Sequence, residues 1–366
     1  MTNNDTIPDF HGSDIEAVAA YYHIDASKIV NFAANVNPLG ISPNLKKELA
    51  ANIDIISQYP ERDYLSLRTA IGEYINANPE HILVGNGSTE LISGVIQSIC
   101  PKEALLISPS YSEYEREVTL CGGQIHYHVL KKENQFQIDI DALMGECNTH
   151  TDMIILCNPN NPTSNAISVS ELDTLLNWCH THNIVVMIDE TYIEFSEHAE
   201  EIEAIPLTSK YDNLVVLRGV SKFFAAPGLR LGYAVCSSSD LRNRIQQNKD
   251  PWSINSIAAK AGEIMFHDAA YINQTKDLII SEKKKMANAL AATNHFKVYA
   301  SESNFLLFEL QNTDLTATDC FTHCIKKGLM FRDCSTFPEL GSQFLRICMM
   351  LPDDNDRIIN ALQELF

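Results

Sequence analysis

The chain has 366 residues and a hydrophobic fraction of 45%, which is enough to form a full core and excludes a disordered protein. Its 47 acidic residues outnumber its 27 basic ones, and a net charge of −20 argues against nucleic acids and anionic membranes as partners. The longest apolar stretches are only strand-sized, and the polar N-terminal stretch lacks a secretory pattern, so we expect a cytoplasmic, soluble protein.

From about residue 63 to 245, short β-rich runs alternate with helical segments. This alternation is typical of an α/β protein with a mostly parallel sheet between helices. The predicted strands, each with its following loop, are "HILVGNG", "EALLISPSY", "TDMIILCNPNNPT", "IVVMIDETY" and "NLVVLRGVSK". A long helical stretch over 256–293 follows, and then a smaller α+β unit. We predict three parts: an N-terminal segment (1–43), a large domain (44–249) and a small domain (250–366).

Polar residues cluster where the predicted strands end, which is where α/β sheets bind their ligands. Their chemistry suits an aromatic, phosphorylated aldehyde. The amine of Lys222 can bond covalently to an aldehyde, and the carboxylate of Asp189 can hold a pyridinium proton. The turn "GNGSTE" offers backbone N–H groups to a phosphate, and Arg230 adds a fixed positive charge.

Four motifs occur in order after "GNGSTE", namely "NPNNPT", "IDETY", "SK" and "GLRLGY". Each residue in them has an ordinary structural explanation as a helix cap, turn residue, packing aromatic or surface ion pair. Together and in this order they resemble the fold-type I pyridoxal-phosphate enzymes of the class I/II aminotransferase superfamily. A non-enzymatic relative would be expected to lack Lys222 or Asp189, and both are present.

The resemblance implies pyridoxal 5′-phosphate as cofactor and a set of residues that bind it. Lys222 would bond to the aldehyde, Asp189 would pair with the ring nitrogen, and Tyr111 would stack on the ring. Asn161 and Tyr192 would bond to the ring 3-oxygen. The phosphate would be held by Gly87, Ser88, Thr89, Ser221 and Arg230. The family also implies a homodimer, in which Tyr59 would reach the cofactor phosphate of the neighbouring subunit.

Further segments resemble the threonine-phosphate decarboxylases of cobalamin biosynthesis, namely "HGSD", "NFAANVNPLG", "YPERDY", "DPWSIN" and "FRDCSTF" with "FLRI". By this resemblance, the phosphate and carboxylate of the substrate would be surrounded by His11, Asn35, Arg332 and Arg346. Which arginine binds which anion is left open. The alternative to a substrate-binding role for His11 is a solvated histidine near the chain terminus. The implied reaction is decarboxylation of phosphothreonine to aminopropanol phosphate, or of phosphoserine to ethanolamine phosphate.

The histidinol-phosphate aminotransferases share several of these motifs, so amino transfer from histidinol phosphate to 2-oxoglutarate is the alternative. Two positions depart from the expected pattern. Gly219 stands where the family usually has a hydroxyl for the cofactor phosphate, and Tyr192 stands where decarboxylases often have phenylalanine. The ten cysteines form no CxxC pair, and "CFTHC" at 320–324 lacks the second half of a zinc site. We therefore expect reduced thiols and no metal.

Overall fold

The computed structural model describes Phe10 and residues 12–366. A seven-stranded sheet forms its larger part, with strand order β2-β8-β7-β6-β5-β3-β4. The neighbours from β7 to β4 pair in parallel, whereas β8 is antiparallel to both β2 and β7. The predicted mostly parallel sheet is confirmed. Its strands are β2 (Ile82–Gly85), β3 (Glu103–Ser108), β4 (Gln124–Val129), β5 (Thr151–Cys157), β6 (Val185–Asp189), β7 (Leu214–Gly219) and β8 (Gly232–Val235).

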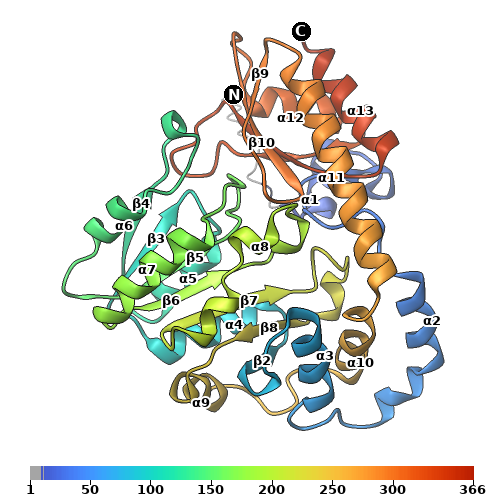
Figure 1. The fold of residues 1–366 in the computed structure, drawn as a ribbon. Helices are drawn as coiled ribbons and strands as arrows, with labels where there is room; N and C mark the ends of the chain where they lie inside the picture. The colour runs from blue at the N-terminus through green and yellow to red at the C-terminus, as the bar shows by residue number, and fades with distance from the viewer. Residues whose placement is uncertain (1–9, 11) are drawn as a thin grey trace, which may run out of the picture.

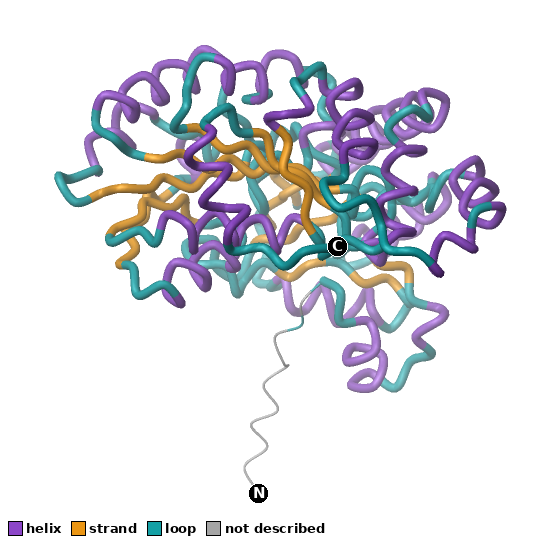
Figure 2. The backbone as a smooth tube through the Cα atoms, turned by 90° about the horizontal axis from the view of Figure 1, so that it is seen from below, coloured by secondary structure: helices purple, strands orange, loops and turns teal. Residues whose placement is uncertain are grey.

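Helices cover both faces of this sheet, because successive strand residues point to opposite sides. In β5, for example, Ile155 packs with α4, α5 and α9, whereas Leu156 belongs to the core that includes α3 and α7. Figure 2 shows the strands enclosed between helices. The helices from this part of the chain are α3 (Leu65–Ile75), α4 (Ser88–Ile99), α5 (Ser112–Leu120), α6 (Ile140–Glu146), α7 (Val169–Thr181), α8 (Ala199–Ile202) and α9 (Ser239–Gln247).

A smaller unit built on an antiparallel sheet of order β12-β13-β10-β9 lies above the large sheet in Figure 1. Its strands and helices are β9 (Phe296–Val298), β10 (Phe305–Leu310), α12 (Ala317–Ile325), β12 (Arg332–Asp333), β13 (Phe344–Cys348) and α13 (Pro352–Gln363). The start of the chain, with α1 (Ile15–Tyr22), joins this unit, because β1 (Val30–Asn31) pairs in parallel with β11 (Leu329–Met330). The helix α2 (Pro43–Ala51) follows.

The stretch predicted as one helix over 256–293 forms two, α10 (Ser256–Met265) and α11 (Ala269–Ala291). The break occurs because Asp268 caps α11, and its side chain accepts a hydrogen bond from the Tyr271 backbone N–H at 3.2 Å. The first of the two helices packs against α2 and α3, next to the large sheet. The long α11 runs along the smaller unit (Figure 1). The three-part domain division stays a prediction.

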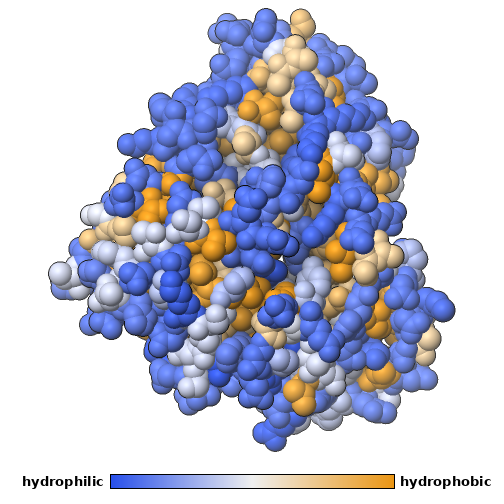
Figure 3. Space-filling view, viewed as in Figure 1, coloured by the Kyte–Doolittle hydropathy of each residue, from blue (hydrophilic) through white to orange (hydrophobic). Residues whose placement is uncertain are grey.

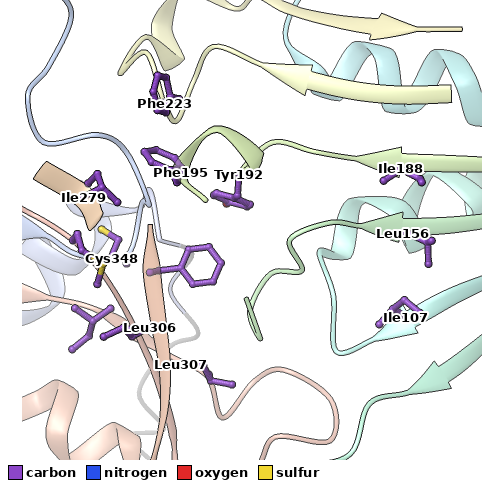
Figure 4. Close-up of a cluster of buried hydrophobic side chains, with 14 of the residues drawn as sticks. Ile107, Leu156, Ile188, Tyr192, Phe195, Phe223, Ile279, Leu306, Leu307 and Cys348 are labelled. Atoms are coloured by element: carbon purple, nitrogen blue, oxygen red, sulfur yellow. The ribbon is translucent and has the colours of Figure 1, made fainter. Parts of the chain in front are cut away.

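One continuous core joins the two units, and Figure 4 shows its centre. Strands of the large sheet contribute Ile107, Leu156 and Ile188, and the smaller unit contributes Ile279, Leu306, Leu307 and Cys348. Tyr192, Phe195 and Phe223 lie between these two groups. The face of the molecule in Figure 3 is mostly hydrophilic, with hydrophobic residues in separate patches. Within the described part of the chain, every helix is too short or too polar to span a membrane.

Candidate active site

The predicted cofactor residues gather at one edge of the large sheet. Asp189 ends β6, Lys222 follows β7, and Asn161 and Tyr111 follow β5 and β3. These four strands run in parallel, so their carboxyl ends lie on the same side. Because β8 is antiparallel to both of its neighbours, β2 points in the same direction as β7. The turn at Gly87 therefore also opens at this edge.

The turn between β2 and α4 forms a cradle of backbone and guanidinium groups. Gly87 has φ +83°, and a Cβ atom there would lie 2.5 Å from Arg230 Nη2. A Cβ atom on Gly232 would lie 2.6 Å from the backbone nitrogen of Ser88. Only glycine allows such close approaches. Ser88 and Thr89 open α4, whose first N–H groups lack helical partners, and this arrangement can bind a phosphate.

The side chain of Lys222 enters this edge between cationic neighbours. Its Nζ donates a hydrogen bond to the Ala34 carbonyl oxygen at 2.7 Å. Burial, followed by the nearby charges of Arg346 and Arg230, lowers the pKa of Lys222 to about 8. Roughly a tenth of the amine is therefore unprotonated at pH 7, the form that attack on an aldehyde requires. Ser221 precedes it and is partly buried.

Asp189 is a buried carboxylate with donors on both oxygens. The Tyr114 hydroxyl donates to Oδ2 at 2.8 Å, and the Thr191 backbone N–H donates to Oδ1 at 2.9 Å. Burial raises the pKa of Asp189, and these hydrogen bonds oppose the rise by stabilising the ionised form. Tyr114 was not among the residues predicted from the sequence. Its spacing of one helical turn from Tyr111 was the only signal for it.

A second polar group faces the same region from the smaller unit and the N-terminal segment. Asn35, with φ 56°, is buried, and its Nδ2 donates to the Tyr192 hydroxyl at 3.3 Å. Arg346 donates to Asn161 Oδ1 and, at 2.7 Å, to the Ala33 carbonyl oxygen. In the described part of the chain, Asn35 Oδ1 and Arg346 Nε are buried without a hydrogen-bond partner. Buried polar atoms of this kind point to a ligand.

The two predicted substrate arginines are direct neighbours. Arg332 of β12 and Arg346 of β13 are opposite residues of an antiparallel pair. Burial, with a contribution from the Arg332 charge, lowers the pKa of Arg346. Opposite like charges destabilise a sheet, so this pair favours an anionic ligand that neutralises it. Arg332 also donates to the Thr336 hydroxyl at 2.9 Å and contacts the Phe10 carbonyl oxygen. The predicted His11 lies outside the described residues.

Tyr59 lies away from this group on the surface, with 83% of its area exposed, and its ring packs against Trp252 at 5.2 Å between centroids. Its predicted contact with a neighbouring subunit's cofactor stays a prediction. Tyr111 is partly buried and meets the ring of Tyr114 edge-on at 5.6 Å. Gly219 of β7 faces Ser88, and a Cβ atom there would lie 3.5 Å from Ser88 Oγ, which is an ordinary contact.

The sequence model of the family described as "Aminotransferase class I and II" matches residues 27–362. The chain belongs to this family. It is 37% identical to a protein of Caldanaerobacter subterraneus subsp. tengcongensis provisionally named threonine-phosphate decarboxylase, over 91% of this chain and 89% of that protein. It is 32% identical to the threonine-phosphate decarboxylase of Salmonella typhimurium, over 97% and 96%.

The structure also resembles the crystal structure of the histidinol-phosphate aminotransferase from Clostridium acetobutylicum. The TM-score is 0.85 at 26% sequence identity, and the match covers 91% of this chain and 98% of that chain. The predicted family and fold class are thus confirmed. The relatives comprise proteins named as decarboxylases and proteins named as aminotransferases.

Pyridoxal phosphate is the cofactor of this family, and the residues present fit it. The cradle at Gly87 admits no side chain and is bordered by Arg230, which suits a phosphate. The lowered pKa of Lys222 suits a bond to the aldehyde. The buried carboxylate of Asp189 suits a pyridinium nitrogen.

Proposed function

We propose that the chain decarboxylates an O-phospho-L-amino acid, with O-phospho-L-threonine or O-phospho-L-serine as substrate. The observation that carries this proposal is the pair Arg332 and Arg346, opposite each other on β12 and β13. Two adjacent guanidinium groups match a small substrate that has both a carboxylate and a phosphate. Sequence identity of 37% and 32% to proteins named as threonine-phosphate decarboxylases supports the lyase reaction. The amine product would be aminopropanol phosphate or ethanolamine phosphate, as a linker for cobalamin.

The geometry supports a division of labour between the arginines. Arg346 donates a hydrogen bond to Asn161, and burial, followed by the Arg346 charge, lowers the pKa of Lys222. This arginine therefore lies beside the groups proposed to hold the cofactor ring. The substrate carboxylate is on the carbon whose nitrogen joins the cofactor, so Arg346 would bind the carboxylate. Arg332 is on the outermost strand of the small sheet. It would bind the phosphate, which lies further along the substrate.

When bound, pyridoxal phosphate supplies an electron sink for the bond that breaks at the substrate α-carbon. Arg346 would orient the carboxylate that leaves as carbon dioxide. Asp189, whose ionised form is stabilised by hydrogen bonds from Thr191 and Tyr114, would keep a proton on the ring nitrogen. Asn161 and the Tyr192 hydroxyl would bond to the ring 3-oxygen. The Nζ of Lys222, whose pKa is about 8, would deliver a proton to the α-carbon after carbon dioxide has left.

The test is carbon dioxide release by the cofactor-loaded protein from O-phospho-L-threonine and O-phospho-L-serine, without an oxo-acid. Release equal to amine formation is expected, and no release from either substrate would refute the proposal. The ratio of kcat/KM for O-phospho-L-threonine over L-threonine tests the arginines. Arg332→Gln should collapse this ratio toward one, whereas Arg346→Gln should lower both values and preserve the ratio. The opposite pattern would reverse the assignment.

Amino transfer is the second candidate, and Tyr192 favours it because decarboxylases often have phenylalanine at this position. The Tyr192 hydroxyl lies within hydrogen-bond distance of Asn35. The structural relative with a TM-score of 0.85 is a histidinol-phosphate aminotransferase. Incubation with histidinol phosphate and 2-oxoglutarate distinguishes the two functions. Glutamate formed at a rate well above that of carbon dioxide release from phosphothreonine would identify an aminotransferase.

We infer that the active unit is a homodimer whose interface includes Tyr59. Apolar side chains are exposed around it, and a groove of about 570 Å³ lies between residues 56–60 and 252–257. The exposed fractions of Ile56 and Trp252 are 64% and 41%. A second copy of the chain would cover this surface. Sedimentation analysis should show a dimer, and Tyr59→Phe should weaken cofactor binding without changing the mass of the assembly. A monomer with full activity would contradict the proposal.

A further inference from the structure

Two helices that begin at the active site are each followed directly by a cysteine. The first, α4, begins at Ser88 in the phosphate cradle and is followed by Cys100, which has φ 51°. The second, α5, begins just after Tyr111 and is followed by Cys121. Both helices belong to the same packed layer on one face of the large sheet. Their cysteines therefore lie at the edge opposite the active site, and the proposed reaction does not use them.

The chain segments that carry these cysteines are in direct backbone contact. The strands that follow, β3 and β4, start side by side, and the Gln124 backbone N–H donates to the Lys102 carbonyl oxygen at 2.8 Å. A Cβ atom on Gly123 would lie 2.5 Å from the Pro101 carbonyl oxygen. At this junction Cys100 Sγ lies 3.8 Å from the carbonyl oxygen of Cys121. The two cysteines are thus neighbours held by the register of the sheet.

Cys100 is the most accessible thiol among the described residues. Cys100 is exposed and Cys121 is partly buried. Cys147 is partly buried on another helix end, and the remaining cysteines are buried. Burial, followed by the neighbouring Cys100 thiol, raises the pKa of Cys121. The raised pKa leaves less of Cys121 as thiolate, and the exposed Cys100 is the thiol that a soluble oxidant meets first.

We propose that Cys100 and Cys121 form a reversible disulfide, a thiol-modification site at the outer ends of α4 and α5. The oxidant is a low-molecular-weight disulfide of the glutathione type. The Cys100 thiolate attacks one sulfur of the oxidant, which forms a mixed disulfide and releases one thiol. The Cys121 thiolate then attacks Sγ of Cys100 and releases the second thiol. Two electrons and two protons pass from the protein to the oxidant, and excess thiol reverses both steps.

The bond would close a loop from residue 100 to 121, which contains β3, Tyr111 and α5. It would join the far end of the helix that carries Ser88 to the far end of the helix that follows Tyr111. Because a cross-link restricts the unfolded chain, the oxidised protein should unfold at a temperature several degrees higher. The modification thus stabilises the layer formed by α4 and α5, at the end away from the active site.

The experiment treats the cofactor-loaded protein with glutathione disulfide, alkylates the remaining thiols, and maps peptides by mass spectrometry without reduction. A peptide pair joined through Cys100 and Cys121, two hydrogens lighter than its reduced form, is expected and should disappear with dithiothreitol. Cys100→Ser should abolish it, and Cys147→Ser is the matched control that should retain it. Cys121→Ser should instead accumulate glutathione on Cys100. A stable glutathione adduct on Cys100 of the unmodified protein, with no cross-link, would overturn the proposal.

Discussion

Gly219 and Gly232 are opposite residues on β7 and β8, and both face the first turn of α4. A Cβ atom on Gly232 would collide with the backbone of Ser88, whereas on Gly219 its nearest neighbours are Ser88 Cβ and Oγ at 3.5 Å. Only position 219 therefore has room for a side chain. We expect Gly219→Ser to place a hydroxyl beside the cradle and to strengthen cofactor binding.

The magnitude follows from one added hydrogen bond. A bond to a neutral group contributes about 1 kcal/mol net, and a bond to a charged group such as a phosphate about 2 kcal/mol. Because 1.4 kcal/mol corresponds to about tenfold in affinity, the Kd for pyridoxal phosphate should fall by roughly 5- to 30-fold. Replacing glycine in a strand also restricts the unfolded chain, which raises the stability of the apoprotein by about 0.5 kcal/mol.

The matched control is Gly219→Ala, which adds the same Cβ atom without the hydroxyl. Equilibrium dialysis of pyridoxal phosphate against each apoprotein gives the three Kd values, and thermal unfolding of the apoproteins separates the effect on folding. The serine variant should bind more tightly than both the alanine variant and the unmodified protein. Equal Kd values for serine and alanine would refute the reasoning, because the hydroxyl would then have no cofactor oxygen within reach.

Three further outcomes follow from the buried polar groups. Tyr114→Phe removes the donor to Asp189 Oδ2, so kcat should fall about tenfold with little change in KM; an unchanged kcat would contradict this role. The rate at which the apoprotein binds cofactor should rise about tenfold per pH unit below 8 and level off above it, because Lys222 must lose its proton; a flat profile would contradict the pKa of about 8. Burial raises the pKa of Glu194 to about 7, despite the nearby Arg218 charge. The buried side chain is therefore favoured in its protonated form in the folded protein. Its contribution to the free energy of unfolding is complete below the unfolded carboxyl pKa and is lost as pH rises through 7, by on the order of 3 kcal/mol. Glu194→Gln should therefore match the unmodified protein near pH 4.5 and exceed it at pH 8 in thermal unfolding, and parallel curves at all pH values would exclude this effect.

The sequence allowed the fold class to be predicted because strands buried on both faces leave continuous apolar runs, and polar motifs mark their carboxyl ends. The same motifs predicted where Lys222, Asp189 and Asn161 gather, since each lies next to a strand that it follows or ends. The antiparallel strand β8 was not recognised, because "GYAV" carries no sign of its direction. The interruption between α10 and α11 was missed because Asp268 acts as a cap only when the backbone turns there.

Other features depend on contacts between distant residues or on strand register. The hydrogen bond from Tyr114 to Asp189 joins positions separated by 75 residues, and no local pattern encodes it. Arg332 and Arg346 are opposite each other only because the chain between them turns so that these residues share a register position. A shift by one residue would move every side chain of the strand to the other face of the sheet. The sequence thus allowed both arginines to be predicted as substrate-binding residues, but not their position opposite each other in the sheet.

The pairing of β1 with β11 has a consequence for protein synthesis. Val30 and Asn31 leave the ribosome early, but their partners Leu329 and Met330 emerge about 300 residues later, or roughly 15–60 s at ordinary translation rates. The Ala33 carbonyl oxygen likewise gains its hydrogen bond only after Arg346 has been synthesised. The large sheet can fold in the meantime with Lys222 still open to solvent. Only a chain translated nearly to its end can enclose that lysine, so prematurely terminated products should hold the cofactor poorly.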